Sequence, residues 1–314
     1  MDGKQKTVVI TGASSGIGKA AAARLVQSGW HVFATVRKRT DGDTLQTEFG
    51  PGLKPVILDV TDRASILAAA EQVSSTLNGN GLDGLVNVAG VGMVRPVEYV
   101  SPGELREIFD INLFGQIAVT QAFLPLLRQA RGRIVNITSV GAHIAIPFGS
   151  PINASKAAFG IFSDTLRLEL RAFGIHVSAV EPGAIKTPAV EKTLGKVEAV
   201  IRGLGTTGAA QYGEMLRRFV QRAYAREMNG SSPDVVARAV NHALTARRPR
   251  LRYRVGKHAS LLAALARFLP DRLLDALLLR IAGLSSPGVV LVDQRQPHRR
   301  TRSHTGDGYE TSSH

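Results

Sequence analysis

The stretch Thr11-Gly12-Ala13-Ser14-Ser15-Gly16-Ile17-Gly18 follows the apolar segment Val8–Thr11 and leads into a helical pattern that starts near Lys19. Glycine at positions 12, 16 and 18 permits a tight turn, close approach of the backbone to a pyrophosphate, and close packing of helix against strand. Phosphate charge is then held at the helix N-terminus. This context predicts a dinucleotide site, and a plain glycine-rich turn is the alternative.

Strand and helix patterns alternate along the rest of the chain. We expect strands at Val8–Thr11, His31–Val36, Val56–Asp59, Leu82–Asn87, Ile134–Thr138, Val177–Val180 and Leu251–Val255. We expect helices at Lys19–Gln27, Ala64–Leu77, Pro102–Arg128, Ala154–Phe173 and Pro233–Leu244. The strands are short apolar runs without strict alternation, which is typical of strands buried on both faces. The pattern predicts an α/β fold with a doubly wound, parallel, Rossmann-like sheet.

The bulk composition is that of an ordinary globular protein of 314 residues, with 44% hydrophobic and 20% charged residues. The absence of cysteine excludes disulfides, thiolate catalysis and cysteine metal sites. No apolar signal-peptide stretch precedes the first strand, so a cytoplasmic protein is expected. Residues 1–294 are expected to form one domain, and the polar segment 295–314 a disordered tail.

The formal net charge of +14 raises the question of nucleic-acid binding. The basic residues are late and scattered with little aromatic interleaving, so a solvated face is expected and nucleic acid is not. Two leucine-rich segments, 261–269 and 273–284, have helical spacing around Pro270 and are too interrupted by charges to span a bilayer. They predict amphipathic helices that cover the core or an oligomer contact, or alternatively lie on a membrane surface.

Charge after the second strand bears on cofactor choice. The chain reads Ala34-Thr35-Val36-Arg37-Lys38-Arg39, with no acid before Asp41. NAD use generally requires a carboxylate here for the ribose hydroxyls, whereas a 2′-phosphate requires a cation. Arg37 is therefore expected to bind that phosphate, with NADP(H) preferred over NAD(H). The alternative is that these cations are merely solvated.

The spacing Gly-x-x-x-Gly-x-Gly resembles the short-chain dehydrogenase/reductase family. Further matches, spanning roughly residues 7–190, are Asp59-Val60, Asn87-Val88-Ala89-Gly90, Asn112, Ser139, Lys156 and Pro182-Gly183-Ala184-Ile185-Lys186-Thr187. The resemblance implies that Asp59 and Val60 lie near the adenine and Asn87, Ala89 and Gly90 along the cofactor. It also implies that Pro182, Gly183, Ile185 and Thr187 belong to the cofactor site, the last two near the nicotinamide amide.

The same resemblance assigns four catalytic roles. A serine binds the substrate oxygen, a tyrosine passes the proton, a lysine lowers that tyrosine's pKa and grips the nicotinamide ribose, and an asparagine supports a water relay. Ser139, Lys156 and Asn112 match three of them, but the tyrosine position, four residues before the lysine, is Ile152. A sec-butyl group has no proton to give, and loss of a positioned donor costs about 10²–10⁴ in rate.

Two functions remain open at this point. The first is an NADP(H)-dependent oxidoreductase that acts on a lipophilic alcohol or carbonyl with weakened proton transfer. His143, after Ser139, is the most plausible substitute donor, although a loop histidine is the simpler interpretation. The second is a non-catalytic NADP(H)-binding pseudoenzyme that acts through protein partners. Segment Ala189–Gly230 resembles the family's substrate lid, and a homo-oligomer is expected.

Overall fold

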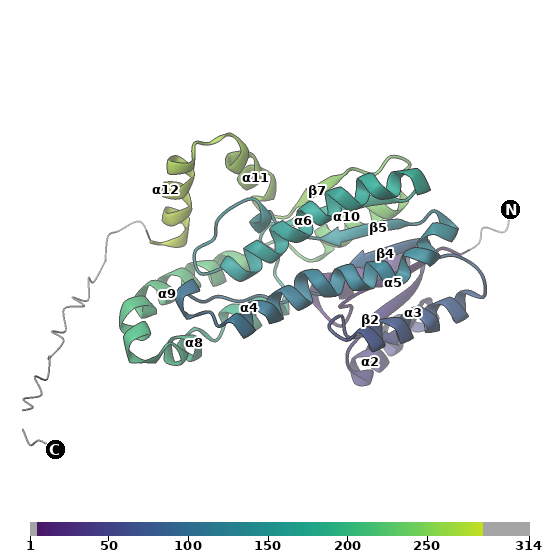
Figure 1. Ribbon diagram of the computed structural model, residues 1–314, viewed down its shortest axis with the longest axis horizontal. Helices are drawn as coiled ribbons and strands as arrows, with labels where there is room; N and C mark the ends of the chain where they lie inside the picture. Colours follow the sequence, from purple (N-terminus) through teal and green to yellow (C-terminus); the bar gives the residue numbers. More distant parts are fainter. Residues whose placement is uncertain (1–4, 285–314) are drawn as a thin grey trace, which may run out of the picture.

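Seven strands form one parallel sheet in the order β3-β2-β1-β4-β5-β6-β7 in the computed structural model, which describes residues 5–284 (Figure 1). The predicted doubly wound sheet is confirmed, and its strand order reverses between β1 and β4. The strands are β1 (Thr7–Ile10), β2 (His31–Val36), β3 (Leu53–Ile57), β4 (Gly84–Asn87), β5 (Arg133–Ile137), β6 (His176–Pro182) and β7 (Arg252–Val255).

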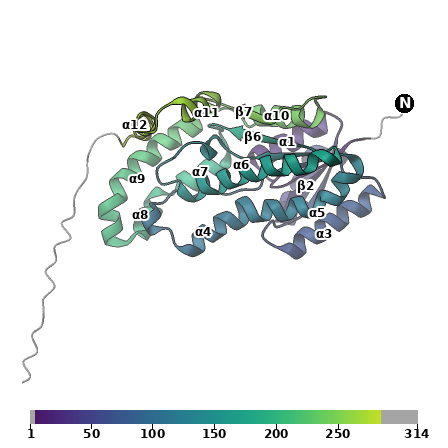
Figure 2. The ribbon, with the colours of Figure 1, turned by 45° about the horizontal axis from the view of Figure 1, so that its top comes forward.

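Helices cover both faces of the sheet, which explains why the strands are continuous apolar runs. On one face, α1 (Gly16–Gln27), α2 (Arg39–Phe49) and α10 (Asp234–Thr245) contribute to a buried cluster with β1, β2 and β6. On the other face, α3 (Arg63–Leu77), α5 (Gly115–Ala130) and α6 (Ser150–Leu170) pack with β1, β4 and β5. Figure 2 shows α5 and α6 side by side along this second face.

Two helical predictions need correction. The expected helix Pro102–Arg128 is divided into α4 (Pro102–Phe109), a π-helical turn at Asp110–Phe114, and α5. Apolar periodicity continues through the turn, so the sequence pattern does not reveal this break. The helix expected from Ala154 begins four residues earlier, at Ser150, because Pro151 is tolerated in a first helical turn.

The lid segment and the C-terminal helices lie at one end of the molecule (Figures 1 and 2). The lid contains α7 (Pro188–Leu194), α8 (Val197–Gly203) and α9 (Gly205–Met228). After β7, α11 (Ala259–Phe268) and α12 (Asp271–Ala282) meet at Pro270, as predicted. Within residues 5–284, no helix combines the length and apolarity required to cross a membrane. The tail expected at 295–314 lies outside the described residues.

Candidate functional site

The glycine loop after β1 contacts two other segments of the predicted site. Gly12 and Gly16 have positive φ angles of 63° and 55°, which glycine adopts without steric cost. A Cβ atom at Gly12 would lie 2.9 Å from the Ala89 Cα atom, and one at Gly16 would lie 3.4 Å from the Thr187 Cβ atom. The loop therefore lies directly against the segments that follow β4 and β6.

The N-terminus of α1 is suited to hold an anion. Ser14 and Ser15 are exposed. Ser15 is the N-cap residue of α1, and its side chain makes no capping hydrogen bond to that helix. The first turn contains no acidic residue, so its amide groups and the helix dipole face no resident carboxylate from that turn. Gly18 packs closely, since a Cβ atom there would lie 2.2 Å from the Gly12 carbonyl oxygen. These features fit a dinucleotide pyrophosphate.

Asn112 and Lys156 converge beside Gly90. A Cβ atom at Gly90 would lie 3.1 Å from the Asn112 Oδ1 atom and 3.5 Å from the Lys156 Nζ atom. The fully buried Asn112 side chain is fixed by two bonds to the backbone of Val91: Oδ1 accepts from its N–H at 2.8 Å, and Nδ2 donates to its carbonyl at 3.0 Å. The π-helical turn thus brings Asn112 to the segment after β4.

Lys156 is buried, and among the described residues 5–284 its ammonium has one hydrogen-bond acceptor, a backbone carbonyl. Its Nζ atom donates to the Ile137 carbonyl oxygen at 2.9 Å. Burial removes the ammonium from water and lowers the pKa of Lys156 from 10.5 to about 8. The side chain is therefore cationic near neutral pH and can lose its proton under mildly alkaline conditions.

Ser139 lies against the first turn of α6, which contains Ile152. The Ser139 Oγ atom accepts from the Gly141 N–H at 3.0 Å, and a Cβ atom at Gly141 would lie 3.3 Å from this oxygen and 3.2 Å from the Asn153 Oδ1 atom. A hydrogen-bonded chain also connects the two halves of the site. Asn112 Nδ2 donates to the Ser155 Oγ atom at 3.1 Å, and Ser155 donates to the Ile152 carbonyl at 2.9 Å.

The expected adenine end contains Arg37, Asp59 and Val60. Arg37 is exposed and forms no salt bridge with any of residues 5–284. A backbone hydrogen bond from Thr61 is the main cause of the lowered pKa of Asp59, and the Arg37 charge contributes. Val60 packs on Gly115, where a Cβ atom would lie 2.5 Å from the Val60 carbonyl oxygen.

Asn87 directs its side chain into the protein interior. Its Nδ2 atom donates to Thr120 Oγ1 at 3.0 Å and to Asn136 Oδ1 at 2.9 Å, and the residue is 1% exposed. The amide therefore joins β4, β5 and α5. Any direct contribution of Asn87 to cofactor binding is left to its backbone.

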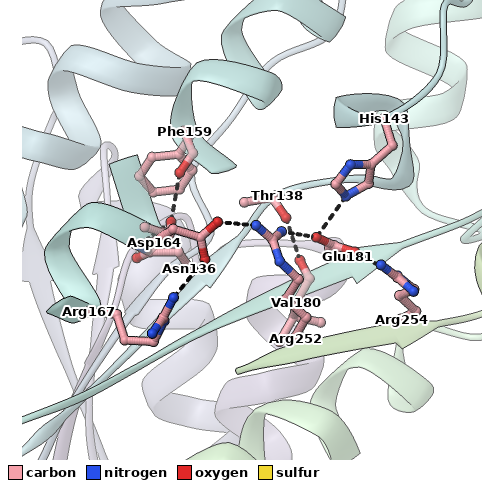
Figure 3. Close-up of polar contacts among 11 residues, drawn as sticks. Asn136, Thr138, His143, Phe159, Asp164, Arg167, Val180, Glu181, Arg252 and Arg254 are labelled. Carbon is pink, nitrogen blue, oxygen red and sulfur yellow. Dashed lines mark hydrogen bonds and ion pairs between the residues drawn. The ribbon is translucent and has the colours of Figure 1, made fainter. Parts of the chain in front are cut away.

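His143 is directed toward Glu181, a carboxylate to which the sequence analysis assigned no role in the site. Its Nε2 atom lies 2.9 Å from the Glu181 Oε1 atom (Figure 3). Asn153 was also given no role, although its Oδ1 atom lies close to Gly141 in the turn after Ser139. A signal for Glu181 existed in the sequence: it is the one acidic residue within the buried strand β6.

Comparison with known proteins gives consistent relatives over most of the chain. A family model for short chain dehydrogenase matches residues 6–198. Human retinol dehydrogenase 5 is 40% identical over 280 residues, covering 86% of this chain and 87% of the relative. Rat 17-beta-hydroxysteroid dehydrogenase type 6 is 37% identical over 282 residues, covering 87% of each.

Solved structures with the same fold include nicotinamide complexes. A short-chain dehydrogenase from Streptomyces avermitilis has a TM-score of 0.70 and 28% identity, covering 90% of this chain and 98% of the other. A 3-ketoacyl-(acyl-carrier-protein) reductase from Brucella melitensis complexed with NADH has a TM-score of 0.63 and 25% identity. An actinorhodin polyketide ketoreductase with NADPH has a TM-score of 0.63 and 27% identity. The last two each cover 77% of this chain and 91% of their own.

Proposed function

The chain belongs to the short-chain dehydrogenase family, and we propose that it is an NADP(H)-dependent oxidoreductase of lipophilic alcohols or carbonyls whose proton transfer is weakened at Ile152. The observation that carries this proposal is the convergence around one site of the glycine loop, Gly90, Asn112 and Lys156, with Ser139 beside the first turn of α6. These residues together support a nicotinamide cofactor site.

The proposed weakness follows from the position of Ile152. A bound nicotinamide would supply or accept hydride, and the chain would have to hold the substrate oxygen and move a proton to or from it. Ser139 can hold that oxygen, but a serine hydroxyl is a poor acid without help. Ile152, one helical turn before Lys156, offers neither a proton nor a hydrogen bond to a developing alkoxide. Turnover by the family's route is therefore expected to be slow.

Restoring the phenol tests the proposal. Ile152→Tyr is expected to raise turnover of hydrophobic alcohols and ketones by about 10²-fold or more, because a positioned acid contributes about 10²–10⁴. NADPH oxidation and cofactor fluorescence would be measured for both proteins on one substrate panel. A parent that is already fast, and is slowed by tyrosine, would contradict weakened proton transfer.

The alternative function is a non-catalytic NADP(H)-binding module that acts through protein partners. Ile152 is again the observation that favours it, because every other matched position retains a residue suited to binding. If both the parent and Ile152→Tyr bind NADPH and neither turns over any substrate, this alternative is supported. The two functions therefore differ in turnover and not in cofactor affinity.

The substrate class is argued from the lid and from the relatives. Apolar side chains of α7, α8 and α9 form two buried clusters, and Phe148, just before α6, packs against both. Phe148 also meets Tyr212 and Phe219 edge-on at ring-centroid distances of 6.4 and 5.4 Å. An apolar lid that packs against Ile146 and Phe148, in the segment between Ser139 and α6, supports a lipophilic substrate, in line with relatives named for retinol and a hydroxysteroid.

The preference for NADP(H) is argued from Arg37. An exposed guanidinium at the end of β2, with no salt bridge among the described residues, is available to form bidentate bonds to a 2′-phosphate. The backbone connects this position to the glycine loop, because the Ala13 N–H donates to the Thr35 carbonyl at 3.0 Å. Both features support recognition of the adenine ribose near Arg37.

Assembly and membrane contact are further parts of the proposal. Phe114, at the end of the π-helical turn before α5, is 56% exposed, and Ile161 and Leu168 on α6 are 66% and 63% exposed, which supports a homo-oligomer contact on this face. On α11 and α12, the exposed Phe268 and Leu273 adjoin arginines, which supports salt-sensitive contact with an anionic membrane surface. Size-exclusion chromatography and flotation with anionic vesicles test the two contacts. The cytoplasmic location stays a prediction.

A further inference from the structure

A buried carboxylate on β6 is contacted by three cationic or hydrogen-bonding groups. Glu181, on β6, is fully buried. Its Oε1 atom lies 2.9 Å from the His143 Nε2 atom and also accepts from Arg252, while Oε2 accepts from the Arg254 Nε atom at 3.1 Å. Arg252 in turn bonds Asp164 on α6. Figure 3 shows Arg252 between the two carboxylates, with His143 approaching Glu181 from the other side.

This charge cluster, formed by His143, Asp164, Glu181, Arg252 and Arg254, joins the elements that carry the proposed catalytic groups. His143 ends the short 3₁₀ turn that begins after Ser139. Asp164 lies eight residues after Lys156 on α6, and Glu181 directly precedes Pro182 of the proposed cofactor segment. A displacement of Glu181 or of its partners would therefore reach the turn of Ser139 and the segment after β6 together.

The two carboxylates are neutralised without His143. Asp164 and Glu181 carry two negative charges, whereas Arg252 and Arg254 carry two positive charges and Arg167, 3.6 Å from Asp164, adds a third. Burial alone would raise the pKa of Glu181, but the hydrogen bonds and charges of His143 and Arg252 outweigh it and hold the pKa below the usual range. An ionised carboxylate only accepts, so the His143 Nε2 atom carries a hydrogen and donates it. Neutralising Glu181 does not require the histidine, whereas tethering the turn does.

We propose that His143 is a positioning residue, whose hydrogen bond to Glu181 fixes the turn of Ser139 against β6. The proposal rests on the proposed function, and it replaces the idea of His143 as a substitute proton donor. Within residues 5–284, the other hydrogen bonds of the Ser139 turn are short-range. The Ala142 N–H donates to the Ser139 carbonyl, the His143 N–H to the Val140 carbonyl and the Gly141 N–H to the Ser139 Oγ atom, each at 3.0 Å. The bond to Glu181 connects it over 38 residues to the sheet.

Amide hydrogen exchange tests the tether without any need for activity. Reporters are the N–H groups of Gly141, Ala142 and residue 143, which are all bonded within the turn. We expect His143→Ala to speed their exchange by about tenfold or more, because local opening becomes easier. His143→Gln keeps a side-chain donor and is expected to stay within about twofold of the parent. Unchanged exchange in His143→Ala would overturn the proposal.

A matched control uses His242, on α10. The His242 Nδ1 atom lies 2.9 Å from the Tyr253 hydroxyl oxygen, so His242→Ala removes a similar single bond elsewhere. It is expected to leave exchange in the Ser139 turn within about twofold of the parent. Equal acceleration by His242→Ala and His143→Ala would mean general loosening and would contradict a specific tether.

Kinetics in the Ile152→Tyr background separate positioning from proton donation. Positioning predicts a lower kcat for His143→Ala, rescue by His143→Gln, and a similar NADPH affinity throughout. Proton donation predicts that glutamine fails as fully as alanine and that a limb of the pH–rate profile disappears, which would overturn the proposal. If no variant turns over, the proposed function fails, and the exchange measurements still decide whether His143 tethers the turn.

Discussion

The segments that follow β1 and β4 contain the residues expected of a nicotinamide oxidoreductase, whereas the first turn of α6 lacks one of them. At β1 and β4, glycines allow backbone contacts that no larger residue would permit, and Asn112 and Lys156 meet beside Gly90. On α6, Lys156 matches the expected lysine, while Ile152, at the tyrosine position, offers no ionisable group. Under the proposed function, cofactor binding therefore draws on many residues, whereas proton transfer depends on one side chain.

The largest expected effect separates the hydroxyl at position 152 from the ring that carries it. We expect Ile152→Tyr to gain turnover by about 10²-fold or more and Ile152→Phe, its matched control, to gain none. Adding Lys156→Met to the tyrosine variant should remove most of the gain, because the lysine charge stabilises the phenolate. Steady-state rates with one ketone and NADPH measure all four proteins. Equal gains from phenylalanine and tyrosine would attribute the effect to packing.

The buried Lys156 provides a pH test of the part of the site that matches the expected residues. Its pKa is about 8 in the folded chain and roughly 10.4 when unfolded. Between these values the unfolded state holds more protons, so the free energy of unfolding rises with pH. Over this window the parent should gain on the order of 3 kcal/mol relative to Lys156→Met.

Urea unfolding between pH 7 and pH 10.5 measures that difference, and subtracting the variant cancels other titrating groups. Lys19→Met is the matched control, because Lys19 is partly exposed and pairs with Glu48 at 2.7 Å. It should follow the parent's pH dependence. If the free energies of unfolding of the parent and Lys156→Met change in parallel with pH, burial does not lower the pKa of Lys156.

The sequence analysis predicted the strands better than it predicted the contacts between loops. Buried parallel strands are continuous apolar runs, so β2 matched residue for residue and the others shifted by a few residues at most. The π-helical turn at Asp110–Phe114 was not predictable, because it changes hydrogen-bond spacing without interrupting the apolar pattern. The tether between His143 and Glu181 joins residues far apart in sequence, and periodicity carries no information on such pairs.

The adenine end gives a smaller effect that concerns binding alone. We expect the parent to bind NADPH more tightly than NADH, and Arg37→Asp to weaken NADPH binding by about 10- to 100-fold, since bonds to charged groups contribute about 1.5–3 kcal/mol. Arg37→Ala should give an intermediate loss, because it removes attraction without adding repulsion. Titration of cofactor fluorescence measures each affinity. Equal parent affinities for the two cofactors would show that Arg37 does not read the phosphate.

The smallest expected effect concerns Glu227, at the junction of lid and cofactor segment. Its Oε2 atom accepts from the Ile185 N–H at 3.3 Å, and burial raises its pKa despite the neighbouring Arg226. Because the folded-state pKa is raised, the free energy of unfolding falls as pH rises through that pKa.

Glu227→Gln keeps an acceptor without the charge, so it should be slightly more stable than the parent at pH 8, with the difference in stability closing toward pH 4. Urea unfolding at both pH values measures the difference in stability. Glu191→Gln is the control, because Glu191 is exposed and accepts a hydrogen bond from Tyr224. A variant less stable than the parent at pH 8 would mean that the carboxylate charge itself holds the lid to Ile185. The attachment of the lid would then depend on one charged side chain, as proton transfer is proposed to depend on position 152.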